Sequence, residues 1–230
     1  MLGVFAPGDI ACFRQGAAID GRSTSGSPEA PYYVDKYPAG VGRVITAGEV
    51  IGLNPHYFNE FDVPIQVEGW INMHPVAGGL QHGVETLFSG PGAKDGNSVY
   101  SIHVEPFATG SLALRLTNTL AVPMKIFHLS SHQHQRGTHV TAWDAGGGKV
   151  FENFDWAHPA ILTFDEPYVL APGDWLDFQC EWDNGVTRPV RRCGDSAFDT
   201  GCTPGDPRAV TFGLTAQDEM CYLVGFYYTE

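Results

Sequence analysis

Two histidines separated by one residue are the first side chains in this sequence whose types and spacing suggest chemistry. They are His132 and His134, within the stretch IFHLSSHQH. Residues two apart in an extended strand project from the same face, so the two imidazoles could bind one metal ion. His128 has the same parity and could act as a third ligand or as a neighbour of the ligands. Surface or hydrogen-bonded histidines are the commoner explanation of such a pair taken alone.

Met220, in the segment DEMC, supplies the second half of the candidate site. A methionine at such a position is usually core filler. A thioether is, however, a soft and neutral ligand that favours Cu(I) over zinc, calcium or magnesium. Two imidazoles and one thioether would suit copper in both oxidation states and leave a coordination position open for dioxygen. The two carboxylates before it, Asp218 and Glu219, are expected to be solvated.

The composition indicates a β-protein that would carry these side chains on strands. Of 230 residues, 43% are hydrophobic and 17% charged, and 28 Gly and 16 Pro separate short apolar runs. In Ser111–Leu116 the leucines alternate with Ser, Ala and Arg, which is the period of a strand. We expect an all-β fold, an antiparallel jelly-roll-like β-sandwich preceded by a partial second β-domain. Strands are predicted at 43–53, 63–73, 97–106, 110–118, 122–134, 137–143, 148–152, 160–165, 174–182, 209–215 and 221–228.

The glycine-rich stretch 76–96 is the most plausible boundary between the two β-domains. Residues 1–31 are rich in Gly, Ser, Ala and Pro and are expected to be loop-like. Residues 32–96 would contain the end of the partial N-terminal domain and a linker. Residues 97–230 would contain the complete sandwich with the candidate metal ligands.

The net charge of −13 makes some partners implausible. Nucleic acids require a basic surface, and anionic membranes repel an acidic one, so we expect neither as a partner. No stretch approaches the roughly 20 apolar residues of a membrane-spanning helix. The first residues, MLGVFAPGDI, lack the basic and apolar regions of a signal peptide.

The five cysteines nevertheless favour an oxidising compartment. Cys193 and Cys202 bracket a polar loop that a disulfide would close easily, and Cys180 and Cys221 lie in strand-like runs that a disulfide could join. Cys12 has no obvious partner. An odd cysteine without a signal peptide suggests a fragment of a longer protein that is secreted or periplasmic. A cytosolic protein with five reduced thiols is the alternative.

Three separated segments together resemble one known family. HQHQRGTHV, PGDWLDFQCEW and DEMCYLVGFYY match, in order and spacing, the C-terminal catalytic domain of the copper type II, ascorbate-dependent monooxygenases. Peptidylglycine alpha-hydroxylating monooxygenase and dopamine beta-monooxygenase are the best-known members of this family. The stretch YPAGVGRVITAGEVIGLNPHYFN at 37–59 also resembles the end of the family's N-terminal domain. The resemblance covers about 32–230.

The resemblance implies that His132, His134 and Met220 hold the copper that binds oxygen. Dioxygen and ascorbate would then be used to hydroxylate a C–H bond of a small-molecule substrate. In the family a second copper transfers electrons, and the resemblance assigns one of its ligands to His56. The other two ligands come from an earlier His-His pair that this sequence does not contain. We therefore expect one copper in this chain and a possible missing N-terminal copper domain.

The resemblance also implies a disulfide between Cys180 and Cys221, and it shows where this chain departs from the family. Peptidylglycine enzymes hold a substrate carboxylate with an arginine, at the position that is Ser130 here. The family's Asn and Tyr after DEMC are replaced by Tyr222 and Val224. A peptide ending in glycine is therefore not expected as substrate, whereas a hydrophobic or phenyl-bearing one is compatible with these replacements.

Two functions of another class remain as alternatives to an enzyme. One is a non-catalytic copper-binding module, which the incomplete second copper site favours. The other is a metal-free adhesive sandwich in which the histidine pair is incidental. Metal analysis distinguishes the metal-free adhesive sandwich from the two copper-binding functions. Ascorbate-dependent oxygen consumption distinguishes the non-catalytic copper-binding module from an enzyme.

Overall fold

The structure is a computed structural model, and it describes the sandwich almost completely. The described residues are 2–5, 36–45, 47–48, 63–68, 73–75, 78–91, 101–187, 205, 208–213 and 218–230. They are almost entirely β-structure and turns, which confirms the all-β prediction. In these ranges there is no helix of the length and apolar character that crossing a membrane requires.

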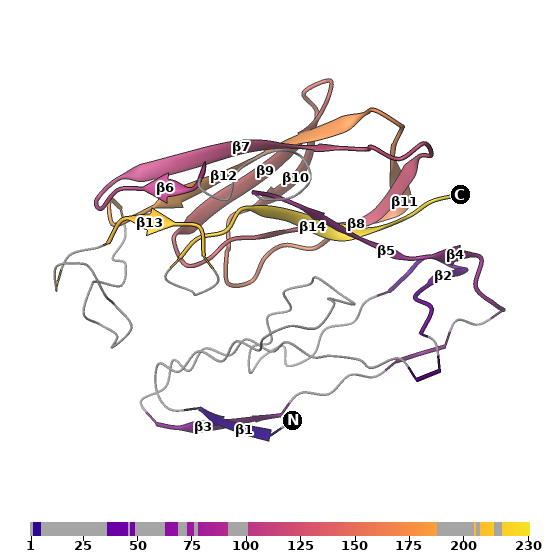
Figure 1. The fold of residues 1–230 in the computed structure, drawn as a ribbon, viewed down its shortest axis with the longest axis horizontal. Coiled ribbons are helices and arrows are strands. Elements are labelled where there is room, and N and C mark those ends of the chain that lie inside the picture. Colours follow the sequence, from indigo (N-terminus) through magenta and orange to yellow (C-terminus); the bar gives the residue numbers. More distant parts are fainter. Residues whose placement is uncertain are drawn as a thin grey trace.

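Two four-stranded antiparallel sheets form the sandwich (Figure 1). The strand order is β11-β8-β14-β5 in one sheet, called the site sheet below, and β10-β9-β12-β7 in the other. The strands are β5 (Glu85–Ser89), β7 (Thr109–Thr117), β8 (Met124–His132), β9 (Gly137–Asp144), β10 (Lys149–Asn153), β11 (Leu162–Leu170), β12 (Trp175–Asp183) and β14 (Tyr222–Tyr228). Apart from the β9–β10 hairpin, successive strands of this set alternate between the sheets, which is the connectivity of a jelly roll.

Three shorter strand pairs lie outside the two main sheets. β6 (His103–Val104) pairs with β13 (Val210–Thr211), and β1 (Leu2–Phe5) pairs with β3 (Ile65–Glu68), both antiparallel. β2 (Val41–Gly42) pairs in parallel with β4 (His82–Gly83). The predicted strand at 43–53 is not formed at 43–45, and its remaining residues fall mostly outside the described ranges.

The sandwich differs from the sequence-based expectation in two strands. β5 lies inside the glycine-rich stretch 76–96, yet it pairs with β14 along its length and belongs to the site sheet. β11 was predicted to end at residue 165 and ends at Leu170. Its pairing with β8 shifts between Thr163 and Tyr168. The shifted segment contains Pro167, which cannot donate a hydrogen bond to the ladder and is tolerated because β11 is an edge strand.

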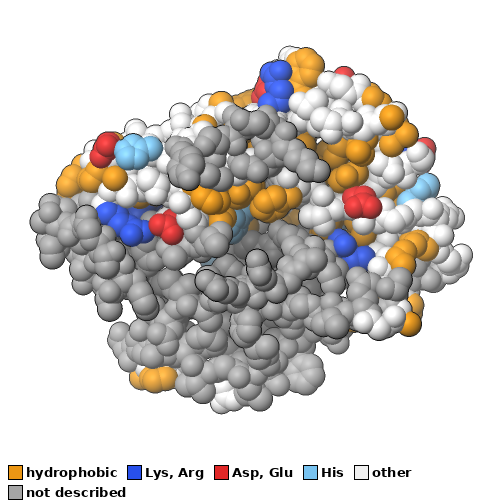
Figure 2. All heavy atoms as spheres, viewed as in Figure 1, with side chains coloured by type: hydrophobic (Ala, Val, Ile, Leu, Met, Phe, Trp, Pro, Cys, Tyr) orange, Lys and Arg blue, Asp and Glu red, His pale blue; other side chains and the backbone are white. Residues whose placement is uncertain are grey.

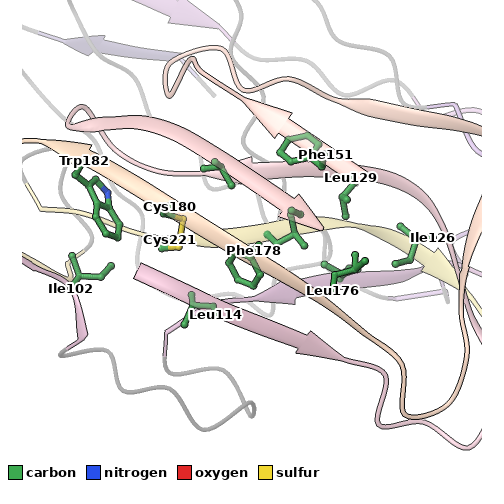
Figure 3. Close-up of a cluster of buried hydrophobic side chains, with 14 of the residues drawn as sticks. Ile102, Leu114, Ile126, Leu129, Phe151, Leu176, Phe178, Cys180, Trp182 and Cys221 are labelled. Atoms are coloured by element: carbon green, nitrogen blue, oxygen red, sulfur yellow. A yellow bond between two sulfur atoms is a disulfide. The ribbon is translucent and has the colours of Figure 1, made fainter. Parts of the chain in front are cut away.

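An apolar core fills the space between the two sheets (Figure 3). In β12 every second residue points into this core, as a strand period requires. Phe178 and Leu176 are at most 1% exposed, and Trp182 is 2% exposed at the end of the strand. The alternating leucines of β7 pack against the same core, as the alternation in Ser111–Leu116 predicts.

A disulfide between Cys180 and Cys221 connects the two sheets within this core (Figure 3). Cys180 lies in β12, and Cys221 immediately precedes β14. The pairing implied by the family resemblance is therefore present. Cys12, Cys193 and Cys202 lie outside the described residues.

Candidate metal centre

His132 is the last residue of β8, where that strand pairs with β14, and His134 follows two residues later. In the ladder His132 is opposite Tyr222, whereas the neighbouring pair, Ser131 and Leu223, points toward the core. Because side chains alternate along a strand, His132 projects from the outer face of the site sheet, and the ring of His134 lies against it. His134 is buried, and His132 is half-buried.

The spacing of the two imidazole rings fits a shared metal ion. Their centroids lie 5.1 Å apart, and the rings meet edge to face at 88°. Metal–nitrogen bonds of about 2.0–2.1 Å would place each centroid about 3 Å from the ion, and at a tetrahedral angle the two centroids would be about 5 Å apart. The observed spacing is compatible with this value, and it is also the spacing of an ordinary edge-to-face ring pair.

A backbone carbonyl sets the orientation of the His134 ring. Nδ1 of His134 lies 3.1 Å from the carbonyl oxygen of Asp218. In a neutral imidazole this contact requires the proton on Nδ1, so Nε2 carries the lone pair that a metal needs. The segment before β14 thus selects the tautomer of a histidine on the neighbouring strand.

Met220 lies in that same segment, two residues before Tyr222. Tyr222 pairs with His132, the last residue of β8, so Met220 and His134 each lie two residues beyond this last pair of the ladder. One carboxylate oxygen of Glu219 also accepts hydrogen bonds from the backbone N–H groups of both His134 and Met220, at 3.0 and 3.3 Å. The methionine segment and the histidine pair are therefore brought together, and Met220 is half-buried.

Glu219 is not solvated as expected but completely buried, with 0% exposure. Burial raises the pKa of its carboxyl to about 7, and the N–H groups that bind it oppose this rise. Its backbone is also fixed, because its N–H donates to the carbonyl of Thr211 and its carbonyl accepts from Gly213. Its parity with Cys221 and Leu223, which point into the core, was the sequence signal for this burial.

The outer face of the site sheet next to the histidine pair carries Ser130 and several aromatic and aliphatic side chains. Ser130, which stands at the position of the family's arginine, is buried, and its hydroxyl donates to the carbonyl of Ala160 at 2.8 Å. Tyr222 stacks on Phe88 with the ring centroids 4.3 Å apart, and Phe88 is 52% exposed. Val224 is opposite both Ser130 and Phe88 in the sheet. Figure 2 shows hydrophobic side chains gathered near the middle of the view.

His128 is separated from the candidate site. It is 2% exposed, and its ring contacts those of Phe127 and Phe226. It lies six residues before His134, which is about 20 Å along a strand and too far for both imidazoles to bind one ion. His56, the predicted ligand of a second copper, lies outside the described residues.

The comparisons with known proteins add no family to these observations. Neither the protein-family models nor the curated proteins that were searched match this chain. Within the described part of the chain, no group of three or more His, Cys, Asp or Glu side chains is placed to hold a metal ion. The candidate set of two histidines and one methionine is of a different composition, since its third donor is a thioether.

Proposed function

We propose that this chain carries the oxygen-activating copper site of an ascorbate-dependent monooxygenase that hydroxylates a C–H bond of a small molecule. His132, His134 and Met220 would hold one copper ion. The observation that carries the proposal is the 5.1 Å spacing of the two imidazole rings beside the methionine segment. Copper held there would supply one-electron redox chemistry with dioxygen, with ascorbate as the reductant.

The protein's own residues have three tasks at such a site. The carbonyl of Asp218 keeps the proton of His134 on Nδ1. The Cys180–Cys221 disulfide anchors the residue that follows Met220 and so restricts the position of the thioether. His132 and Met220 are only half-buried, which leaves a route for small molecules. The disulfide also supports a secreted or periplasmic location.

The outer face next to the histidines supports an apolar or aromatic substrate. The hydroxyl of Ser130 is engaged with a backbone carbonyl, and a serine has no positive charge with which to bind a carboxylate. Phe88, which stacks on Tyr222, instead offers an exposed aromatic ring on this face, and the buried side chains of Tyr222 and Val224 add no charged group to it. These contacts favour a hydrophobic substrate over a peptide that ends in glycine.

A non-catalytic copper-binding module is the second candidate function. The sequence contains no adjacent His-His pair to complete the family's electron-transferring site. Such a module would use the same three ligands and bind copper without turnover. Ascorbate-dependent oxygen consumption by the copper-loaded protein distinguishes the two functions, because only the enzyme consumes oxygen in proportion to the product that it forms.

X-ray absorption at the copper edge, with copper stoichiometry, tests the proposed ligand set. We expect one Cu(I) per chain with two imidazoles and one sulfur scatterer. Met220→Ile should remove the sulfur scatterer and leave the protein folded, because Met220 is half-buried and outside the apolar core. Met73→Ile is the matched control, since Met73 is 59% exposed and distant in sequence from the ligands. Wild-type protein that binds no Cu(I), or binds it without sulfur, would contradict the proposal.

A further inference from the structure

The carboxylate of Glu219 occupies an unusual place beside the candidate ligands. Oε1 accepts the backbone N–H of Arg136 at 2.7 Å, and Oε2 accepts the backbone N–H of His134 at 3.0 Å. Oε2 also accepts the indole N–H of Trp182 at 2.9 Å and the backbone N–H of Met220 at 3.3 Å. Four donors therefore surround one acceptor, and two of them belong to candidate ligands.

The strand ladder does not fix the relative position of these two ligands. The last paired residues of β14 and β8 are Tyr222 and His132. His134 follows the end of β8, and Met220 precedes the start of β14, so both lie beyond the regular pairing. Beyond the end of the ladder, the Glu219 carboxylate connects the two backbones by accepting hydrogen bonds from the N–H groups of His134 and Met220.

Core packing alone does not account for a glutamate at this position. A buried carboxylate is costly unless hydrogen bonds satisfy it, and an apolar residue of similar volume would fill the same space at no such cost. The four hydrogen bonds that the carboxylate accepts join three segments of the chain. These segments are the end of β8, the end of β12 and the residues before β14.

We propose that Glu219 is the positioning residue of the copper site, in that its carboxylate holds His134 and Met220 at the separation at which both can bind one ion. This inference rests on the proposed function. Glu219 acts through the two ligands and does not itself bind the metal. Removal of the carboxylate should therefore weaken copper binding and release the thioether, even in a protein that remains folded.

Glu219→Gln is the first test, because it retains the size of the side chain but replaces an acceptor oxygen by an NH₂ group that faces N–H donors. We expect the affinity for Cu(I) to fall by about 10–100-fold, as for other residues that orient metal ligands. We also expect the sulfur scatterer at the copper edge to weaken or disappear. Glu181→Gln is the matched control, since the Glu181 side chain is 44% exposed and binds His139 and Gln179 instead.

Amide hydrogen exchange in the metal-free protein provides a readout that does not depend on copper. In Glu219→Gln the amides of His134, Arg136 and Met220 should exchange at least about tenfold faster. The amides of Leu114 and Val140, which lie in the opposite sheet, should keep their wild-type rates. Unchanged local exchange and unchanged copper affinity in the folded variant would overturn the inference.

Trp182→Phe provides a second variant if Glu219→Gln does not fold. It removes one of the four donors and leaves the two ligand amides on the carboxylate. We expect a smaller increase in local exchange and a smaller loss of Cu(I) affinity; no change in either would overturn the inference. If wild-type protein binds no Cu(I) through sulfur, the proposed function fails, whereas the exchange rates still show whether Glu219 joins the two segments.

Discussion

Asp183, the last residue of β12, shows how a single carboxylate organises the chain next to the candidate site. It accepts hydrogen bonds from the backbone N–H groups of Val186 and Thr187, at 2.6 and 2.9 Å, and from the Thr187 hydroxyl. Its own N–H donates to the carbonyl of Arg136 at 2.9 Å. Asp183 thus fixes the end of the strand that carries Trp182, a donor to Glu219.

The Asp183 carboxylate should make stability depend on pH in the acidic range. Burial acts to raise its pKa, but the hydrogen bonds from Thr187 and Val186 outweigh burial and hold the pKa below the ordinary value of an aspartate. Because the folded-state pKa lies below the unfolded-state value, the carboxylate stabilises the fold above that value and loses this contribution as the pH falls through the folded-state pKa. Asp183→Asn should lower the free energy of unfolding at pH 6 and show a shallower loss on acidification. Urea unfolding from pH 6 to pH 3 measures the free energy of unfolding and its dependence on pH. If this free energy depends on pH equally in the variant and the wild type, the Asp183 carboxylate does not cause the loss of stability in acid.

At the scale of elements, the contact between β14 and β8 decides whether the ligand segments meet. Gly225 lies in the middle of β14, opposite Leu129 of β8 and Leu87 of β5. A Cβ atom at this position would lie 2.1 Å from the carbonyl oxygen of His128. The close approach of the two strands therefore requires glycine, and a backbone atom cannot rotate away as a side chain can.

Gly225→Ala should be strongly destabilising for this reason. We expect the free energy of unfolding to fall by about 1–3 kcal/mol, the usual cost of inserting atoms into a filled site. Gly83→Ala is the control, because Gly83 also lies in a strand but a Cβ there would meet nothing within 4 Å. Urea unfolding followed by tryptophan fluorescence measures the difference. Equal stability of the two variants would show that β14 can move away from β8 without cost.

At the scale of the whole molecule, the sandwich depends on one covalent link between its sheets. The Cys180–Cys221 disulfide closes a segment with a sequence separation of 41 residues. Such a link reduces the conformational entropy of the unfolded chain, and the effect increases with the length of the closed loop. Because Cys221 follows Met220 directly, the same link stabilises both the sandwich and the candidate site.

Removal of this disulfide should lower stability substantially. For a loop of this length the entropic effect corresponds to about 4 kcal/mol. We expect the melting temperature of the Cys180→Ala/Cys221→Ala variant to fall clearly below that of the wild type. Wild-type protein treated with a reductant should fall to the same melting temperature. A melting temperature that neither change affects would mean that the two cysteines do not form a bond that stabilises the fold.

The sequence alone predicts those features of this protein that depend on local periodicity. The alternation in Ser111–Leu116 correctly separates the leucines of β7, which pack against the core, from the other side chains, because side chains of a strand alternate between its faces. Turn residues locate most strands of the sandwich within two residues of their observed limits. The histidine pair and Met220 are recognisable by type and spacing, and their role in binding copper stays a prediction.

Only the tertiary structure decides which segments meet. The sequence of β5 resembles a glycine-rich linker. It forms a strand of the site sheet because its backbone pairs with the edge of β14. Glu219 is expected to be solvated; its parity with Cys221 and Leu223 indicates its inward direction, but the donors that bind its carboxylate come from residues 37 to 85 positions earlier in the chain. The stacking of Phe88 on Tyr222 arises in the same way. Non-local pairing creates these contacts, and the local pattern of residues contains no information about the partner strand.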